Sequence, residues 1–239
     1  DFDKIGSFVA TIDYRNYGDF YYANENGTIE DNTFSVTDYD INIGWGRKLN
    51  ERLSIGANLK FAGIQYENNS SFAVAVDVAG TYITKTNWVF SLVARNIGSE
   101  LYNNYQGFRN KLPFKMQAGA SKRLEHLPLT FIVLYDNIQK WDLSYDDPLD
   151  LENNYDPMTG QMKEKGKLDK FAENMFSHFV FAGELNLGKN LALRLGYNYG
   201  LRQNMKSPTK KGAVGLSYGV AINVYKFNIS YSRSEMHIH

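Results

Sequence analysis

The sequence predicts an all-β fold, an antiparallel up-and-down transmembrane β-barrel, and three observations support this prediction. Large apolar or aromatic residues alternate with small or polar ones at a period of two over most of the 239-residue chain. The alternating segments have roughly 8–15 residues, whereas globular strands usually have about 5–6 and tilted membrane strands need about 9–11. Short and long connections also alternate along the chain, as they do in outer-membrane barrels.

The clearest alternation lies in residues 191–201 and 213–224. The first segment reads LALRLGYNYGL, so every odd position is leucine or tyrosine and every even position is Ala, Arg, Gly or Asn. Successive side chains of a strand point to opposite faces. The two segments hold one charge, Arg194. A soluble sandwich would place Lys and Glu on its water-facing side, so an apolar lipid-facing band around a polar lumen fits better.

The same pattern, less strict in places, predicts about eleven strands. In chain order they are 6–15, 35–48, 53–66, 72–82, 88–97, 113–123, 129–145, 178–187, 191–201, 213–224 and 227–232. The short turns predicted between them are 49–52, 85–87, 125–128, 188–190 and 225–226. The connections predicted to face outside are 18–34, 67–71, 98–112, 146–177 and 202–212.

Bacterial single-chain barrels have an even number of strands, so we expect further strands beyond those of this chain. Residues 1–239 are predicted to be a single outer-membrane β-barrel domain, incomplete at both ends. The full barrel is expected to have about 14 strands, of which this chain would supply about 11–12.

Composition excludes several other classes of protein. A formal net charge of zero argues against a nucleic-acid binder. The absence of cysteine excludes a disulfide framework and a thiolate metal cluster. A mean hydropathy of −0.43, without an apolar run long enough for a membrane helix, excludes a helical bundle.

No catalytic pattern is visible in the sequence. The four histidines, His126, His178, His237 and His239, are widely dispersed, and no nucleotide-binding or hydrolase motif occurs. We therefore predict a protein that is not an enzyme, with no catalytic residues, no metal and no cofactor.

An acidic run begins the longest predicted loop. Carboxylates are the oxygen ligands that calcium takes, but their spacing here does not match an EF-hand. A solvated external loop is the favoured interpretation, with calcium binding as the alternative. The run consists of Asp142, Asp146, Asp147, Asp150, Glu152 and Asp156.

Residues 163–176, KEKGKLDKFAENMF, interrupt the β pattern with an amphipathic helical one. A helix of two to three turns does not persist alone in water, so its apolar face should dock on something. The barrel rim is the first candidate. A partner surface, or lipopolysaccharide phosphates met by the lysines, are the others.

One stretch carries a resemblance to a known family. Residues 112–143 read LPFKMQAGASKRLEHLPLTFIVLYDNIQKWDL, in which a strand opening with LPF leads through a KRL-EH-P turn to an N-x-x-x-W-D segment. This resembles the PorQ family of the type IX secretion system of Bacteroidetes, and the likeness is shared with the related PorV barrels. Residues 46–61 and 91–101 are similar to other structural segments of that family.

The resemblance implies a fatty-acid-transporter-like barrel of 14 strands in the cell outer membrane. It also implies membership of the surface attachment complex, in which a sortase removes the carboxy-terminal signal of cargo proteins and anchors them to lipopolysaccharide. The expected partners are outer-membrane lipid and lipopolysaccharide, a PorZ-like surface protein, the sortase and a PorV-like barrel.

The expected function is non-enzymatic anchoring of the PorZ-like protein through the external loops. The alternative is an outer-membrane transporter of hydrophobic small molecules, and a third possibility is a soluble lipocalin-like binder. The small and polar residues assigned to the lumen weaken the transporter interpretation. The partner-binding residues predicted in the longest loop are Trp141, Tyr145, Tyr155, Leu168, Phe171 and Met175.

Overall fold

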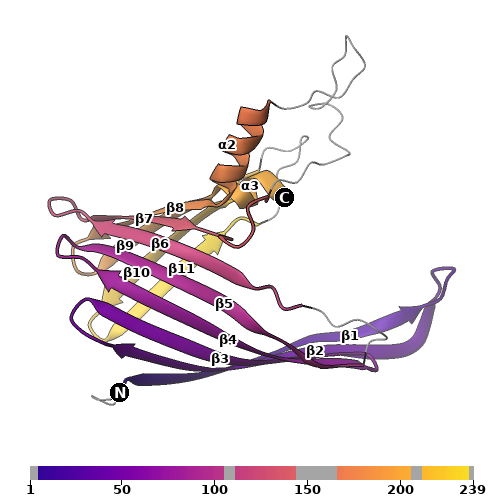
Figure 1. The fold of residues 1–239 in the computed structure, drawn as a ribbon. Coiled ribbons are helices and arrows are strands. Elements are labelled where there is room, and N and C mark those ends of the chain that lie inside the picture. The colour runs from indigo at the N-terminus through magenta and orange to yellow at the C-terminus, as the bar shows by residue number, and fades with distance from the viewer. Residues whose placement is uncertain (1–4, 105–110, 144–165, 206–211, 237–239) are drawn as a thin grey trace, which may run out of the picture. The chain divides into compact units, whose positions relative to one another are not determined.

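The computed structural model describes residues 5–104, 111–143, 166–205 and 212–236. These residues form eleven strands in one sheet, and the strands follow one another through the sheet in sequence order (Figure 1). The all-β, antiparallel, up-and-down prediction is therefore confirmed. Contacts divide the chain into two units, Asp1–Tyr82 with Ser91–Met116 and Ile83–Phe90 with Gln117–His239.

The first unit holds most of the first five strands, while the β4–β5 turn and the strand residues beside it belong to the second unit. The β1–β2 hairpin is longer than its neighbours. The β2–β3 pairing ends at Val36 and Tyr66, while the β1–β2 pairing continues to Ala23 and Ile29. The strands are β1 (Ser7–Ala23), β2 (Ile29–Lys48), β3 (Leu53–Tyr66), β4 (Asn69–Ile83) and β5 (Trp88–Asn103).

Polar side chains are linked to one another on one face of the first unit. Lys60 Nζ lies 2.7 Å from Asp77 Oδ2 and donates to Asn96 Oδ1 at 3.2 Å. The Asn96 N–H donates to Asp77 Oδ1 at 2.8 Å. Farther along, the buried Glu100 accepts from Ser71. The face predicted to be small and polar is thus held together by charged and amide groups.

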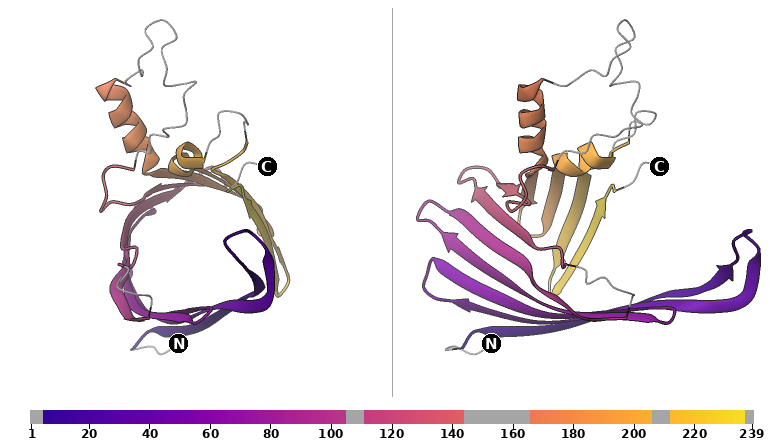
Figure 2. Two further views of the ribbon diagram at one scale, coloured as in Figure 1. Left: turned by 90° about the vertical axis from the view of Figure 1, so that its right-hand side faces the viewer. Right: turned by 45° about the vertical axis from the view of Figure 1, so that its right-hand side comes forward.

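The second unit holds the remaining strands and the helices of the described chain. Both helices lie at the strand ends opposite to the 188–190 and 225–226 turns (Figures 1 and 2). The elements are β6 (Lys115–Arg123), β7 (Leu129–Tyr135), α2 (Lys167–Ser177), β8 (Phe179–Leu187), β9 (Leu191–Asn198), α3 (Tyr199–Met205), β10 (Leu216–Val224) and β11 (Phe227–Ser234).

Two predicted strands are too long, and an asparagine lies at or just after the observed end of each. The strand predicted over 129–145 stops at Tyr135, because Asn137 adopts a positive φ of 54° that turns the chain. The strand predicted over 191–201 stops at Asn198, whose Oδ1 accepts the Leu201 N–H at 2.9 Å. This contact caps α3, which replaces the end of the predicted strand.

The predicted loops contain more strand than expected. Most of 18–34 is strand, with the turn confined to 24–28, and β5 extends to Asn103 within the predicted loop 98–112. β4 likewise begins at Asn69, within the predicted loop 67–71. Cross-strand partners prolong these strands, as in the pairs Phe20–Phe34 of β1 and β2 and Ile64–Ser71 of β3 and β4. The short turns at the opposite strand ends are confirmed, as is the helix predicted in 163–176, which spans Lys167–Ser177.

No helix among the described segments combines the length and apolarity needed to cross a membrane.

Substitution of Gly98 tests the close packing of β4 and β5. A Cβ at Gly98 would overlap the Val74 carbonyl oxygen, whereas a Cβ at Gly80 meets nothing within 4 Å. We expect Gly98→Ala to lower the free energy of unfolding by about 1–3 kcal/mol, as overpacking does. Gly80→Ala is the matched control and should change it little. Urea titration in detergent micelles measures both, and equal effects would contradict the packing described.

Candidate functional site: an apolar sheet face and the cluster around α2

The strands of the second unit place their large apolar side chains on one face of the sheet. Pairing aligns Leu185, Leu193, Val220 and Tyr231 in one row across β8 to β11. The side chains of this face are accessible, and Leu195 is 58% exposed. The adjacent row on the other face contains the ion pair between Arg194 Nε and Glu184 Oε2, at 2.7 Å. Large apolar side chains on an accessible face are the reverse of a water-soluble sheet.

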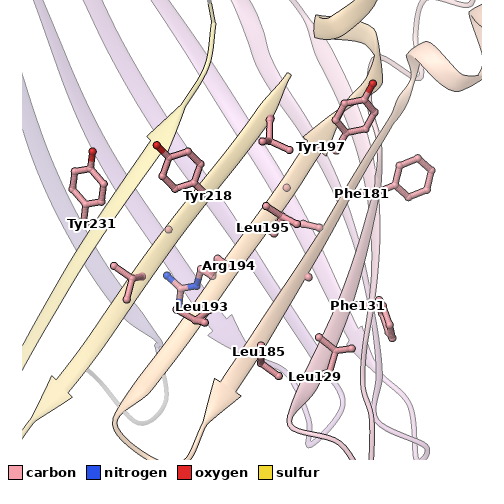
Figure 3. A pocket seen from close by; sticks show the side chains of 16 residues that line it. Leu129, Phe131, Phe181, Leu185, Leu193, Arg194, Leu195, Tyr197, Tyr218 and Tyr231 are labelled. Carbon is pink, nitrogen blue, oxygen red and sulfur yellow. The ribbon is translucent and has the colours of Figure 1, made fainter. Parts of the chain in front are cut away.

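A groove of about 810 Å³ crosses this apolar face. Its lining is mainly leucine, phenylalanine and tyrosine from β7 to β11, together with Val220, small residues and Arg194, and is shown as sticks in Figure 3. Gly183 lies in register between Phe131 and Leu195, so a row of large side chains has a gap at this position. The missing side chain at Gly183 therefore adds to the space of the groove within this apolar face.

Aromatic residues lie toward both ends of the strands. The hydroxyl groups of Tyr197, Tyr218 and Tyr231 point toward the strand ends that lead to α3 (Figure 3). At the opposite ends, Trp88 and Tyr225 are exposed. Tyr and Trp favour the headgroup level of a membrane because one end of each ring is apolar and the other is polar.

The helix α2 is held in place by polar side chains on its buried side. Asn174 Nδ2 donates to the Trp141 carbonyl at 2.7 Å, and its Oδ1 accepts the Leu143 N–H at 2.9 Å. His178 is fully buried, with Nδ1 at 2.7 Å from the Asp136 carbonyl and Nε2 at 2.9 Å from the Trp141 carbonyl. The helix and the segment after β7 are therefore fastened by side-chain contacts to the backbone.

Stacked rings reinforce these contacts. The His178 ring stacks on Tyr135 at 4.9 Å between centroids and on Trp141 at 5.8 Å. Trp141 also contacts Phe171 of α2 at 5.6 Å, and Phe176 contacts Tyr199 of α3 at 5.9 Å. The aromatic rings and carbonyl groups around His178 hold its ring in place between β7 and α2.

The apolar side of α2 stays largely accessible. Leu168 is 83% exposed, Phe171 54% and the neighbouring Trp141 52%, while Met175 is half-buried. The expectation that the apolar face docks on the sheet rim holds in part, since Phe171 contacts Trp141 and Phe176 contacts Tyr199, while Leu168 stays exposed. A partly exposed apolar face of this kind is typical of an interaction site.

The structure brings four of the six predicted partner-binding residues into this one cluster. Tyr145 and Tyr155 lie outside the described residues, as do the members of the acidic run after Asp142. Within the described part of the chain, no group of three or more acidic or histidine side chains is placed to hold a metal ion. Contact of the cluster with a partner remains a prediction.

Sequence reasoning missed the residues that organise the cluster. Asn174, Ser177 and His178 are the buried polar residues at the end of α2. The sequence gives no clear signal for them, because Asn174 flanks the apolar stripe and His178 follows the helix. Polar residues at such positions are usually solvated, so their burial against carbonyl groups could not be inferred without the fold.

Comparison with known proteins gives no assignment. No protein-family model matches the chain. No curated protein sequence matches it significantly. The fold and the site therefore define only a broad class of protein. It is an all-β, up-and-down sheet with an accessible apolar face, compatible with an outer-membrane β-barrel.

The Asn174 contacts can be tested directly. Asn174→Ala leaves the Trp141 carbonyl and the Leu143 N–H without this partner, and we expect it to weaken the docking of α2 by about 1–3 kcal/mol. Hydrogen exchange measures this as faster exchange of the α2 amides and of Leu143. Asp169→Ala, on the exposed side of the same helix, is the control. Unchanged α2 exchange in Asn174→Ala would contradict the docking role.

Proposed function

We propose that this chain is a non-enzymatic outer-membrane β-barrel protein of the type IX secretion system's surface attachment complex. Its role is to anchor a PorZ-like surface protein through the loops at the helix-bearing end of its strands. The single observation that carries the membrane part is the accessible apolar face formed by β7 to β11.

Burial of this face in lipid follows from its chemistry. Complete burial of an exposed side chain such as Leu195 or Phe131 lowers the free energy by about 1.5–3 kcal/mol. Backbone donors and acceptors within the sheet are paired between strands, as a membrane requires. The ion pair Arg194–Glu184 lies on the opposite face, away from the proposed lipid.

The orientation follows from the connections. Turns of three and two residues join β8 to β9 and β10 to β11, while α2 and α3 lie at the other strand ends. In outer-membrane barrels the short turns are periplasmic and the longer loops external. The helix-bearing end is therefore the proposed external side.

The anchoring role is supported by the cluster around α2. Trp141 and Phe171 are large apolar residues held in fixed positions by ring contacts and by the polar dock beneath them. Aromatic side chains that are accessible and already ordered lose little entropy on binding. The assignment to a secretion complex, with the sortase, a PorV-like barrel and lipopolysaccharide as further partners, is supported by the resemblance of residues 112–143, which include Trp141.

Transport of hydrophobic small molecules is the second candidate, and the apolar groove is the observation in its favour. The groove lies on the face proposed to contact lipid. The opposite face of the first unit presents the Lys60, Asp77 and Asn96 network instead of an apolar cavity. Anchoring therefore fits the geometry better than transport does.

A charge on the apolar face tests membrane insertion. Leu195→Arg places a cation among the groove residues, and such a substitution at mid-membrane costs about 2–4 kcal/mol. We expect a strong reduction of folded protein in the outer-membrane fraction, measured by heat-modifiable migration. Ala79→Arg is the control, since Ala79 is exposed and lies two residues after Asp77, on the same polar face of β4. Equal tolerance of both arginines would argue against lipid contact.

Charges on α2 test the anchoring role. Leu168→Glu with Phe171→Glu removes the exposed apolar surface without altering the buried Asn174 and His178. Extraction in mild detergent, followed by mass spectrometry, should show loss of a co-purifying surface protein while the barrel stays in the membrane. Lys167→Gln with Lys170→Gln is the matched control. Full retention of the surface protein by the double glutamate variant would contradict this role for α2.

A further inference from the structure

His178 lies where the helix α2 meets the sheet of the second unit. It follows the last residue of α2 and precedes the first residue of β8 (Figure 1). Its backbone carbonyl accepts the Asp136 N–H at 2.7 Å, just beyond the end of β7. Its side chain is fully buried. A change in the state of this ring therefore acts on the contact between α2 and the segment that follows β7.

Both ring nitrogens of His178 face a carbonyl oxygen. Nδ1 lies 2.7 Å from the Asp136 carbonyl oxygen, and Nε2 lies 2.9 Å from the Trp141 carbonyl oxygen. A neutral imidazole donates from one nitrogen and accepts at the other, whereas an imidazolium donates from both. In a neutral ring, one nitrogen lone pair would point at a carbonyl oxygen, and that carbonyl would lose its histidine donor. The geometry is therefore that of a doubly protonated ring.

Three further features stabilise a positive charge at this position. The His178 ring stacks on Tyr135 and on Trp141, at 4.9 and 5.8 Å between ring centroids, and the faces of aromatic rings attract cations. His178 is also the C-cap residue of α2, where the helix dipole favours a cation. The last turn of α2 contains no basic residue. The protonated ring thus supplies the positive charge that this helix end otherwise lacks.

Within the described segments, no carboxylate forms an ion pair with the ring. Asp136 Oδ1 instead accepts from Gln117 Nε2 at 2.8 Å and from the Asn137 N–H at 3.0 Å. The charge of the ring is therefore coupled to its carbonyl and aromatic contacts. The titratable and charged residues on the elements around the ring are Tyr135, Asp136, Lys140, Asp142, Lys167, Asp169, Lys170, Glu173, Glu184, Tyr199 and Arg202.

We propose that His178 is a pH-sensitive switch that controls how firmly α2 is held against the segment after β7. The doubly protonated ring donates to both carbonyl groups and holds the helix. Transfer of one proton to solvent water removes one donor and sets a lone pair against a carbonyl oxygen, so α2 separates from the segment more readily. The inference deepens the proposed anchoring function and rests on it, because a loosened α2 no longer holds Trp141 and Phe171 in fixed positions.

The direction of the pH dependence follows from the two protonation states. Histidine changes its charge between about pH 5 and 8. The second donor is present at the acidic end of this range and is lost as the pH rises through it. The Asn174 contacts to Trp141 and Leu143 do not titrate, so they persist at both ends. Alkaline pH should therefore loosen α2 without unfolding the sheet.

The first test measures the protonation of the ring in the full chain in detergent micelles. His126→Gln, His237→Gln and His239→Gln together leave His178 as the sole histidine. Nitrogen-15 spectra of the labelled imidazole distinguish a nitrogen that carries a proton from one that does not. Both nitrogens should carry a proton at about pH 5.5, and only one at about pH 8.5. The same protonation state at both pH values would overturn the inference.

The second test measures the docking of α2 by hydrogen exchange. Protection factors correct for the intrinsic pH dependence of exchange. Those of the α2 amides should fall about tenfold between the two pH values, because a hydrogen bond to a charged group is lost. Those of the β9 amides should stay constant. His178→Gln, which keeps a donor and an acceptor but does not titrate, should abolish the pH dependence, and the control His126→Gln in the exposed turn should keep it.

Protection of α2 that does not change with pH, or that changes equally in His178→Gln, would contradict the switch. The sole-histidine spectra retain the test if His178→Gln does not fold. Neither measurement involves a partner protein. Failure of the switch is therefore distinguishable from failure of the anchoring proposal, which is tested by the glutamate variants of Leu168 and Phe171.

Discussion

The pairing of strands with a period of two is the constraint on which the rest of this molecule depends. Pairing satisfies the backbone, so a strand needs no water at its N–H and C=O groups. The period then sorts side chains, with Leu193 and Leu195 on one face and Arg194 on the other. A sheet built in this way is stable with its apolar face in lipid and its polar face away from it. The mean hydropathy of the chain is polar because it averages over these two opposed faces and the connections between strands.

The strand ends show how the same chain produces ordered structure outside the sheet. Polar side chains, not an apolar core, fasten α2: Asn174 and His178 bind the backbone around Trp141. The apolar side of the helix is consequently left accessible. The β1–β2 hairpin beyond Val36 is similarly held by the bulge at Gly18 and by the rings around Phe34. Side chains on both α2 and this hairpin are therefore ordered in advance, and ordered side chains lose less entropy when a partner binds.

The sequence was sufficient for the strands but not for their ends. Alternation is local, so segments such as 53–66 were predicted with their observed bounds. The continuation of β1 to Ala23 depends on pairing with Ile29 and on a bulge, neither of which alternation reveals. The end of β7 and the start of α3 each depend on one asparagine, Asn137 and Asn198, whose turn and capping roles compete with strand formation.

The site around α2 was predictable in its residue types and not in its geometry. The amphipathic pattern identified the helix and its apolar members, including Leu168 and Phe171. Which face would dock could not be inferred, because a short helix normally buries its apolar side. The two ring nitrogens of the buried His178 lie within hydrogen-bond distance of the Asp136 and Trp141 carbonyls, which follow the end of β7. The cost of leaving those carbonyls unpaired is a long-range effect that no local pattern contains.

The central claim is that one face of the sheet contacts lipid, and nitroxide scanning of β9 tests it most directly. The chain has no cysteine, so single cysteines can be introduced at each position from Leu191 to Asn198 and spin-labelled in lipid vesicles. Collision with oxygen should dominate at the odd positions. Collision with a water-soluble nickel chelate should dominate at the even positions, giving a period of two. Equal access of the nickel chelate to both sets would contradict the claim.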